Sequence, residues 1–206
     1  MRYRFGVVAF AAISLGCASA PASTQAQVPA TAAKDTAVQS IPVGLGTLKQ
    51  DEFTMALRAE ALLIKVTPLD ESIIRLAAPD TYHRLKSLRD SRARDAKARS
   101  ASDEPQLFMV SFFSYQPDVT FQPEDLQIEH QGRLMRPAAI LPLTPTWGKG
   151  RLAQQEIASA VYALTEPFNF ELPITVRYGM FENGEWQRII SKLQVERGKV
   201  SGRDKN

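Results

Sequence analysis

The alternation of apolar and polar residues predicts a β-hairpin at residues 53–68. In the stretch EFTMALR every second residue is apolar, from Phe53 to Leu57. In LLIKVTPL the alternation resumes with the opposite phase, from Leu62 to Val66. A period of two is typical of a half-buried strand, and the change of phase indicates a tight turn at 59–61.

The pattern becomes helical over residues 70–99. Asp70 precedes a short apolar run at 73–76 and is suited to cap a helix there. A second helix is expected to begin at Pro79, because proline in the first helical turn gives up no hydrogen bond. Its apolar stripe recurs at three-residue spacing only as far as Leu88, so we expect the polar remainder to fray.

Strands return after this insertion. LFMVSFFSY, at 107–115, is apolar on both faces, which predicts a central strand covered on both sides. A short hairpin is expected around Gln131-Gly132. EIASAVYAL, at 156–164, predicts a further strand of small and apolar residues.

The segment LPITVRYGMFENGEWQRIISKLQV predicts a final hairpin centred on Asn183-Gly184. That dipeptide is preferred in two-residue turns of type I′. With the turn there, Tyr178 lies opposite Ile189 and Leu172 opposite Val195, which places the apolar residues on one face.

Seven or eight short strands separated by turns predict a mainly β fold. We expect an immunoglobulin-like antiparallel β-sandwich with a short α-helical insertion at about residues 70–99. The cysteine and tryptophan hallmarks of antibody domains are absent, so the prediction concerns architecture only. A single domain is expected at 47–200, followed by a disordered tail at 201–206. Residues 17–46, rich in Ala, Pro, Ser and Thr, are expected to form a disordered tether.

The beginning of the chain has the composition of an export signal. A short basic stretch precedes an uncharged run at 5–16, which is shorter than the roughly 20 residues that span a bilayer. Two cleavage interpretations compete. One places the cut after the A-x-A box that ends at Ala20, or after Ala26. The other places it directly before Cys17, the only cysteine in the sequence.

Leu15-Gly16-Cys17 resembles the lipobox of bacterial lipoproteins. The match covers the first 17 residues, and Ser14 stands where the family prefers leucine. The resemblance implies a signal peptide at 1–16 and lipidation of the Cys17 sulfur. Because two or more acyl chains anchor a protein stably, it also implies a membrane-bound product. Ala18 rather than aspartate follows the cysteine, which in this family implies the outer membrane, with the domain facing the periplasm.

A basic segment is the first candidate for binding. The formal net charge is only +3, but seven Lys and Arg residues lie between Arg84 and Arg99 against two aspartates. Arg89, Arg92, Arg94 and Lys97 are therefore candidates for contact with an anionic glycolipid or another envelope polymer. The alternative is an ordinary solvated helix face. Nucleic acid is not an expected partner, because the chain carries an export signal and no aromatic residues are interleaved with these cations.

The stretch PLTPTWGKGRL, at 142–152, is the second candidate. Its prolines and glycines predict a long loop that carries Trp147. The ring is expected either to fold back over the end of the sandwich or to form part of an exposed surface that binds a partner.

Residues with catalytic chemistry are scattered. His83 and His130 are expected to be exposed, and neither has the spacing of a metal ligand. The pairs Asp70-Glu71 and Glu124-Asp125 adjoin prolines and are expected to cap helices or turns. No G-x-S-x-G elbow occurs. We therefore expect no catalytic residue, no metal and no cofactor.

These observations favour a non-enzymatic, lipid-anchored protein of the cell envelope that binds a protein or glycan partner. One alternative is a secreted enzyme with a carboxylate-based site, which requires a concave pocket where two carboxylates converge. The other is a binder of anionic envelope polymers that acts through the basic helix.

Overall fold

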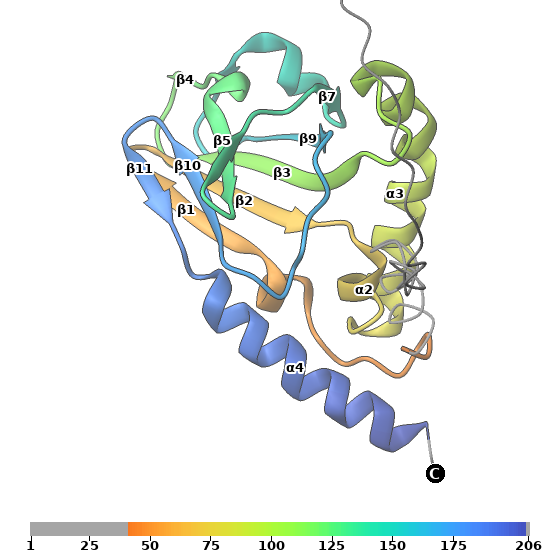
Figure 1. Cartoon of the computed structure of the whole chain (residues 1–206). Helices are drawn as coiled ribbons and strands as arrows, with labels where there is room; N and C mark the ends of the chain where they lie inside the picture. The colour runs from red at the N-terminus through yellow and green to blue at the C-terminus, as the bar shows by residue number, and fades with distance from the viewer. Residues whose placement is uncertain (1–40, 205–206) are drawn as a thin grey trace, which may run out of the picture.

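The computed structural model describes residues 41–204 (Figure 1). These residues form a five-stranded sheet in the order β1-β2-β3-β9-β7, a four-stranded sheet in the order β11-β10-β5-β6, and the pair β4-β8. All neighbouring strands within these sheets are antiparallel. The predicted mainly β, antiparallel character is therefore confirmed for this part of the chain.

The five-stranded sheet begins with the predicted hairpin. Met55 pairs with Val66, and the chain reverses at Glu60, which has a φ of 51°. The predicted central strand lies in the middle of the sheet. The strands are β1 (Met55–Ala59), β2 (Leu62–Pro68), β3 (Gln106–Ser114), β9 (Ile157–Leu164) and β7 (Ala139–Pro142).

The four-stranded sheet contains the second predicted hairpin. Gln131 and Gly132 have φ values of 52° and 72°, the left-handed conformations that a type I′ turn requires. The strands of this sheet are β5 (Leu126–His130), β6 (Arg133–Met135), β10 (Ile174–Tyr178) and β11 (Phe181–Asn183). The small third sheet consists of β4 (Val119–Thr120) and β8 (Arg151–Leu152).

The core lies between the two larger sheets. Phe112 of β3 is fully buried, and its ring centroid is 5.7 Å from that of Tyr178 on β10. Phe108 packs in the same layer against Phe168, at 5.1 Å between centroids. Alternate residues of each strand supply this layer, as expected for sheets with one buried face.

The helical insertion forms where it was predicted but is more regular. The Asp70 carboxylate accepts a hydrogen bond from the Ser72 amide at 3.0 Å and caps α2 (Glu71–Ile74). The expected fraying after Leu88 is wrong, because helix α3 (Pro79–Ser100) continues without interruption to Ser100. Ala96, which is fully buried, gives the last turns a packing contact that the spacing of large apolar residues did not indicate.

The predicted hairpin at Asn183-Gly184 is wrong. The chain reverses four residues earlier, where Tyr178 pairs with Phe181 and Gly179 has a φ of 57°. The Asn183 side chain accepts a hydrogen bond from the Glu185 amide at 2.7 Å, which leads the chain into α4 (Trp186–Arg203). Every third or fourth residue of α4 is buried, namely Trp186, Ile189, Ile190, Leu193, Glu196 and Val200. This period belongs to a helix and overrides the alternation on which the hairpin was based.

Residues at both ends of the expected domain are packed. Ile41 is only 8% exposed, and the Thr47 hydroxyl donates to the Glu196 carboxylate of α4 at 2.8 Å. Gly46 lies against the backbone of Leu76 so closely that a Cβ atom would sit 2.3 Å from its carbonyl carbon. Part of the expected tether therefore contacts the domain, and α4 extends into the expected tail as far as Arg203.

Candidate functional site

The face of the five-stranded sheet that points away from the four-stranded sheet carries a line of paired residues. Leu63 on β2 pairs with Arg58 on β1 and with Phe113 on β3. Phe113 pairs in turn with Ile157 on β9. Because directly paired residues project from the same face of a sheet, these four residues form one line across four strands. We call this line the outer row.

The outer row is largely apolar and open to solvent. Ile157 is 50% exposed, and Leu63 and Phe113 are half-buried. Tyr115, directly after β3, is 39% exposed, and its ring packs edge-on against Phe113 at 5.0 Å between centroids. Contiguous exposed apolar side chains are a feature of contact surfaces, whereas single exposed ones need no explanation.

The outer row ends in a positive charge. The Arg58 guanidinium lies 5.4 Å from the centroid of the Tyr115 ring, in the geometry of a cation–π contact. Within residues 41–204, Arg58 has no carboxylate partner. The charge is therefore held in place by the aromatic ring without being neutralised.

The other end of the same face is covered. Leu141 of β7 pairs with Val161 of β9, and these residues are 3% and 0% exposed. Helix α3 runs past this end of the sheet (Figure 1). A row of small and polar residues separates the two ends. It consists of Ala56, Lys65, Ser111 and Ser159. Helix α3 thus leaves the outer row uncovered.

The outward face of the four-stranded sheet is charged and balanced. Arg177 of β10 forms ion pairs with Glu129 of β5 at 2.8 Å and with Glu182 of β11 at 3.2 Å. Leu134 of β6 pairs with Glu129 on this face and is 53% exposed. We call this surface the charged face. It offers a single exposed leucine rather than an apolar line.

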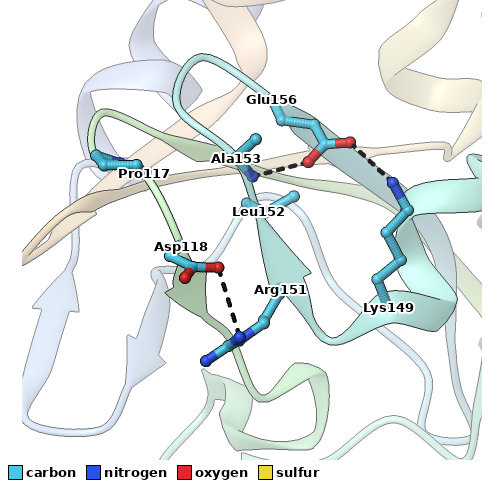
Figure 2. A pocket seen from close by; sticks show the side chains of 7 residues that line it. All are labelled: Pro117, Asp118, Lys149, Arg151, Leu152, Ala153 and Glu156. Atoms are coloured by element: carbon cyan, nitrogen blue, oxygen red, sulfur yellow. Dashed lines mark hydrogen bonds and ion pairs between the residues drawn. The ribbon is translucent and has the colours of Figure 1, made fainter.

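An open hollow of about 470 Å³ lies beside β8 (Figure 2). Figure 2 shows two ion pairs in it, Asp118 with Arg151 and Lys149 with Glu156, each at 3.5 Å. The apolar residues of the lining are Pro117, Ala153 and the fully buried Leu152. The charges that face the hollow are therefore balanced.

The hollow contains two carboxylates, as the enzyme alternative requires, and each of them forms an ion pair with a neighbouring cation. The Glu156 carboxylate accepts a hydrogen bond from the Ala153 amide at 2.8 Å. This bond, followed by the charge of Lys149, holds the pKa of Glu156 below its ordinary value. A carboxylate with a lowered pKa is a poor general acid near neutral pH. Asp118 is exposed and pairs with Arg151.

The four cations predicted as a binding site do not form one patch. Arg89 is half-buried and pairs with Glu71 at 2.6 Å, and Lys97 pairs with Asp103 at 2.7 Å. Arg92 and Arg94 have no acidic partner in the described part of the chain. At 100° per residue, Arg92 and Arg94 point about 160° apart around the helix. Two of the four charges are therefore neutralised, and the other two diverge.

Trp147 is buried. It lies in the 3₁₀ helix η3 (Pro145–Lys149) and is 8% exposed. Its ring packs edge-on against Phe112 and Phe121, at 5.7 and 5.5 Å between centroids. Of the two predicted arrangements, the structure shows the ring folded back onto the core. An exposed contact by Trp147 is therefore wrong.

The two histidines differ. His83 is exposed on α3, whereas His130 is 4% exposed, so its predicted exposure is wrong. The His130 ring accepts a hydrogen bond from the Asn169 amide at 3.1 Å and stacks on Phe168 at 4.8 Å between centroids. Its other nitrogen lies 3.2 Å from the Pro173 carbonyl oxygen. These contacts hold the loop before β10 against the sheet.

The carboxylate pair at the start of α2 has a structural role. Glu71 accepts hydrogen bonds from Arg75 at 2.8 Å and Tyr82 at 2.9 Å. Burial would raise the pKa of Glu71, but these bonds and the charge of Arg89 outweigh it and lower the pKa. The second pair, Glu124-Asp125, lies in the 3₁₀ helix η2 (Pro123–Asp125), directly after its proline.

Other expected sites have no described counterpart. Cys17 lies outside the described residues. In the described part of the chain no group of three or more His, Cys, Asp or Glu is placed to hold a metal ion. The helices from residue 41 onward include none long and apolar enough to cross a membrane.

The sequence contained one sign of the outer row. Both faces of 107–115 are apolar in the sequence, which predicts a strand covered on both sides. The missing information was how far α3 extends over the sheet, which depends on tertiary packing.

Comparisons of the chain with protein-family models, curated proteins and solved structures gave no significant match. The functional argument therefore depends on the residues described above.

Proposed function

We propose that this protein is a non-enzymatic, lipid-anchored protein of the cell envelope that binds a protein partner through the outer row. Cys17 carries the lipid, and the domain faces the periplasm from the outer membrane. The observation that carries the binding role is the outer row itself, an apolar line left open on the same sheet face whose other end is covered. An exposed apolar surface of this kind is typical of a contact site.

The proposal includes a finer description of the fold. We treat the two larger sheets as an open, immunoglobulin-like sandwich, because both are antiparallel and their facing sides share one apolar core. Such sandwiches present their outward faces as rigid surfaces, which suits a binding module. Helix α4 and the α2–α3 insertion are additions to that plan.

Anchoring is tested with the variant Cys17→Ala. The wild-type protein should enter the detergent phase, and its N-terminal peptide should gain the mass of acyl chains. Cys17→Ala should lose both properties while the domain still folds. A mature chain that begins at Pro21 or Gln27 contradicts the anchored form.

Binding is tested by native electrophoresis of the gently solubilised envelope. Wild type should migrate in a complex, and Ile157→Glu should release the monomer. Leu134→Glu is the matched control, because Leu134 is 53% exposed and Ile157 50%. Equal migration of the two variants contradicts the proposed surface.

A second candidate function is contact with anionic glycolipid through α3. It is favoured by Arg92 and Arg99, which lie seven residues apart on one side of α3 and have no acidic partner in residues 41–204. Attraction between exposed charges is screened over roughly 8–10 Å at physiological salt. Binding of the Cys17→Ala protein to anionic vesicles should therefore fall steeply as salt rises, and Arg92→Gln with Arg99→Gln should weaken it. Vesicle binding that is insensitive to salt and to these substitutions contradicts this candidate.

A further inference from the structure

The spacing of the outer row fits a helix better than it fits a strand. Neighbouring strands lie about 4.8 Å apart, so Leu63, Phe113 and Ile157 repeat at about that interval across the sheet. Side chains three or four residues apart on a helix repeat at about 5–6 Å. The outer row lies on the face of the sheet, not at its edge. The backbones of its strands already pair with one another, so a partner strand would find no free backbone groups there. The Asn183 side chain caps one edge by donating to the Ala56 carbonyl at 2.8 Å.

The sheet has room for a second helix beside α3. Residues two apart on a strand are separated by about 6.8 Å, and the outer row lies two such steps from the row of Leu141 and Val161. The separation is therefore about 14 Å, whereas packed helices need about 8–10 Å between their axes. A helix on the outer row leaves α3 in place. Figure 1 shows α3 crossing the ends of the strands, the direction in which the outer row runs.

The positive charge on the outward face of the five-stranded sheet favours a partner with an acidic residue. The outward positions of β1, β2, β3 and β9 include Arg58 and Lys65 but no acidic residue. Lys65 already pairs with Asp51 at 3.0 Å, whereas Arg58 is held over Tyr115 without a carboxylate. A partner with an acidic residue at one end of its apolar stripe complements this arrangement. A second copy of the chain that met this face symmetrically would present another outer row, which supplies no carboxylate.

From these observations we propose that the occupant of the outer row is an amphipathic helix of another protein, with an Asp or Glu that pairs with Arg58. This inference rests on the proposed function and specifies the chemistry of the partner. It places the apolar side of the helix on Leu63, Phe113 and Ile157.

The test is site-specific photo-cross-linking of the full-length chain in the envelope. A photoreactive residue replaces Ile157 or, as the control, Leu134, and the attached peptide is identified by mass spectrometry. We expect a protein adduct from position 157 alone. The attached peptide should have apolar residues at helical spacing with an adjacent acidic residue. Arg58→Glu should lower the yield about tenfold, the effect of losing one charged contact. Arg58→Gln, which introduces no repulsion, should lower it less.

Several outcomes overturn this inference. They are an adduct of twice the chain's mass, an adduct to lipid, a partner peptide without an acidic residue, and a yield that Arg58→Glu does not change. The adduct of twice the mass, the peptide without an acidic residue and the unchanged yield still leave a protein on the outer row, whereas an adduct to lipid also contradicts the protein-binding function. The absence of any adduct at position 157, in a protein that is anchored, overturns both the inference and the docking role of the outer row.

Discussion

The two larger sheets present opposite kinds of surface to solvent. On the charged face, Arg177 forms ion pairs with Glu129 and Glu182, so these charges are balanced within the sheet. On the other sheet, the outer row leaves apolar side chains in water and Arg58 without a carboxylate. Both sheets belong to one antiparallel fold with a shared core, so the fold alone does not explain the contrast. This contrast is the basis for proposing the outer row as the partner-binding surface.

The largest expected effect separates the two sides of a single strand. Phe112 and Phe113 are adjacent on β3, but Phe112 is fully buried and Phe113 belongs to the outer row. Phe112→Ala should destabilise the domain by about 3–5 kcal/mol, the cost of a large cavity. Phe113→Ala should cost about 1 kcal/mol or less, because half-exposed side chains contribute little. Chemical denaturation measures both values, and equal losses would show that the two sides of β3 are misassigned.

A buried carboxylate should matter more than an exposed one. Glu196 is 2% exposed and accepts hydrogen bonds from Thr47 and Arg203. Glu196→Gln should lower the free energy of unfolding by about 1–3 kcal/mol at pH 7. Glu129→Gln on the charged face should change it by about 1 kcal/mol or less.

The pH dependence of unfolding sharpens this prediction. Burial would raise the pKa of Glu196, but the hydrogen bonds from Thr47 and Arg203 outweigh it and lower the pKa from its ordinary 4.5. A lowered folded-state pKa contributes stability above pH 4.5, and this contribution is lost as the pH falls through the lowered value. Unfolding titrations should show this acid loss in wild type and a smaller loss in Glu196→Gln. Superimposable curves would mean that Glu196 is not linked to folding.

A dye that binds apolar surfaces should distinguish the two outward faces. Ile157→Glu should reduce the fluorescence of such a dye on the Cys17→Ala protein, because it interrupts a contiguous apolar line. Leu134→Glu removes an equally exposed side chain that stands alone, so the fluorescence should change little. A larger loss from Leu134→Glu would reverse the comparison.

The smallest expected effect is on the charged face. Arg177 lies on β10 and forms two partly exposed ion pairs, and its side chain is 44% exposed. Arg177→Ala should change the free energy of unfolding by about 1 kcal/mol or less. Water screens the attraction within exposed ion pairs, so losing such a pair costs little. A loss of several kcal/mol in thermal or chemical denaturation would show that this face is part of the folding core.

Local chemistry made much of the fold predictable. The phase change at 59–61, the Gln131-Gly132 turn and the Asp70 cap each depend on a few neighbouring residues, and each forms as expected. The region from Trp186 onward was misassigned because Asn183-Gly184 occurs both in hairpin turns and before helices. The helical spacing of Trp186, Ile189 and Leu193 decides between them.

The candidate site was less predictable than the fold. The apolar residues of β3 are visible in the sequence. Their exposure, however, depends on how much of the sheet face α3 covers. The charges of α3 were also visible, but their neutralisation by Glu71 and Asp103 depends on contacts outside the helix. The burial of Trp147 depends on a loop that folds back over Phe112. Each of these features is set by contacts between distant segments, which periodicity does not report.

The most direct test of the central claim compares cysteine labelling at the two faces. Ile157→Cys and Leu134→Cys replace side chains of similar exposure, 50% and 53%, so a maleimide should label both at similar rates in the purified protein. The labelled peptides are quantified separately from any that contain Cys17. In the intact envelope, the account predicts that labelling at position 157 slows at least about tenfold, because a bound partner covers it. Labelling at position 134 should be unchanged. Equal labelling of the two positions in the envelope would contradict the account.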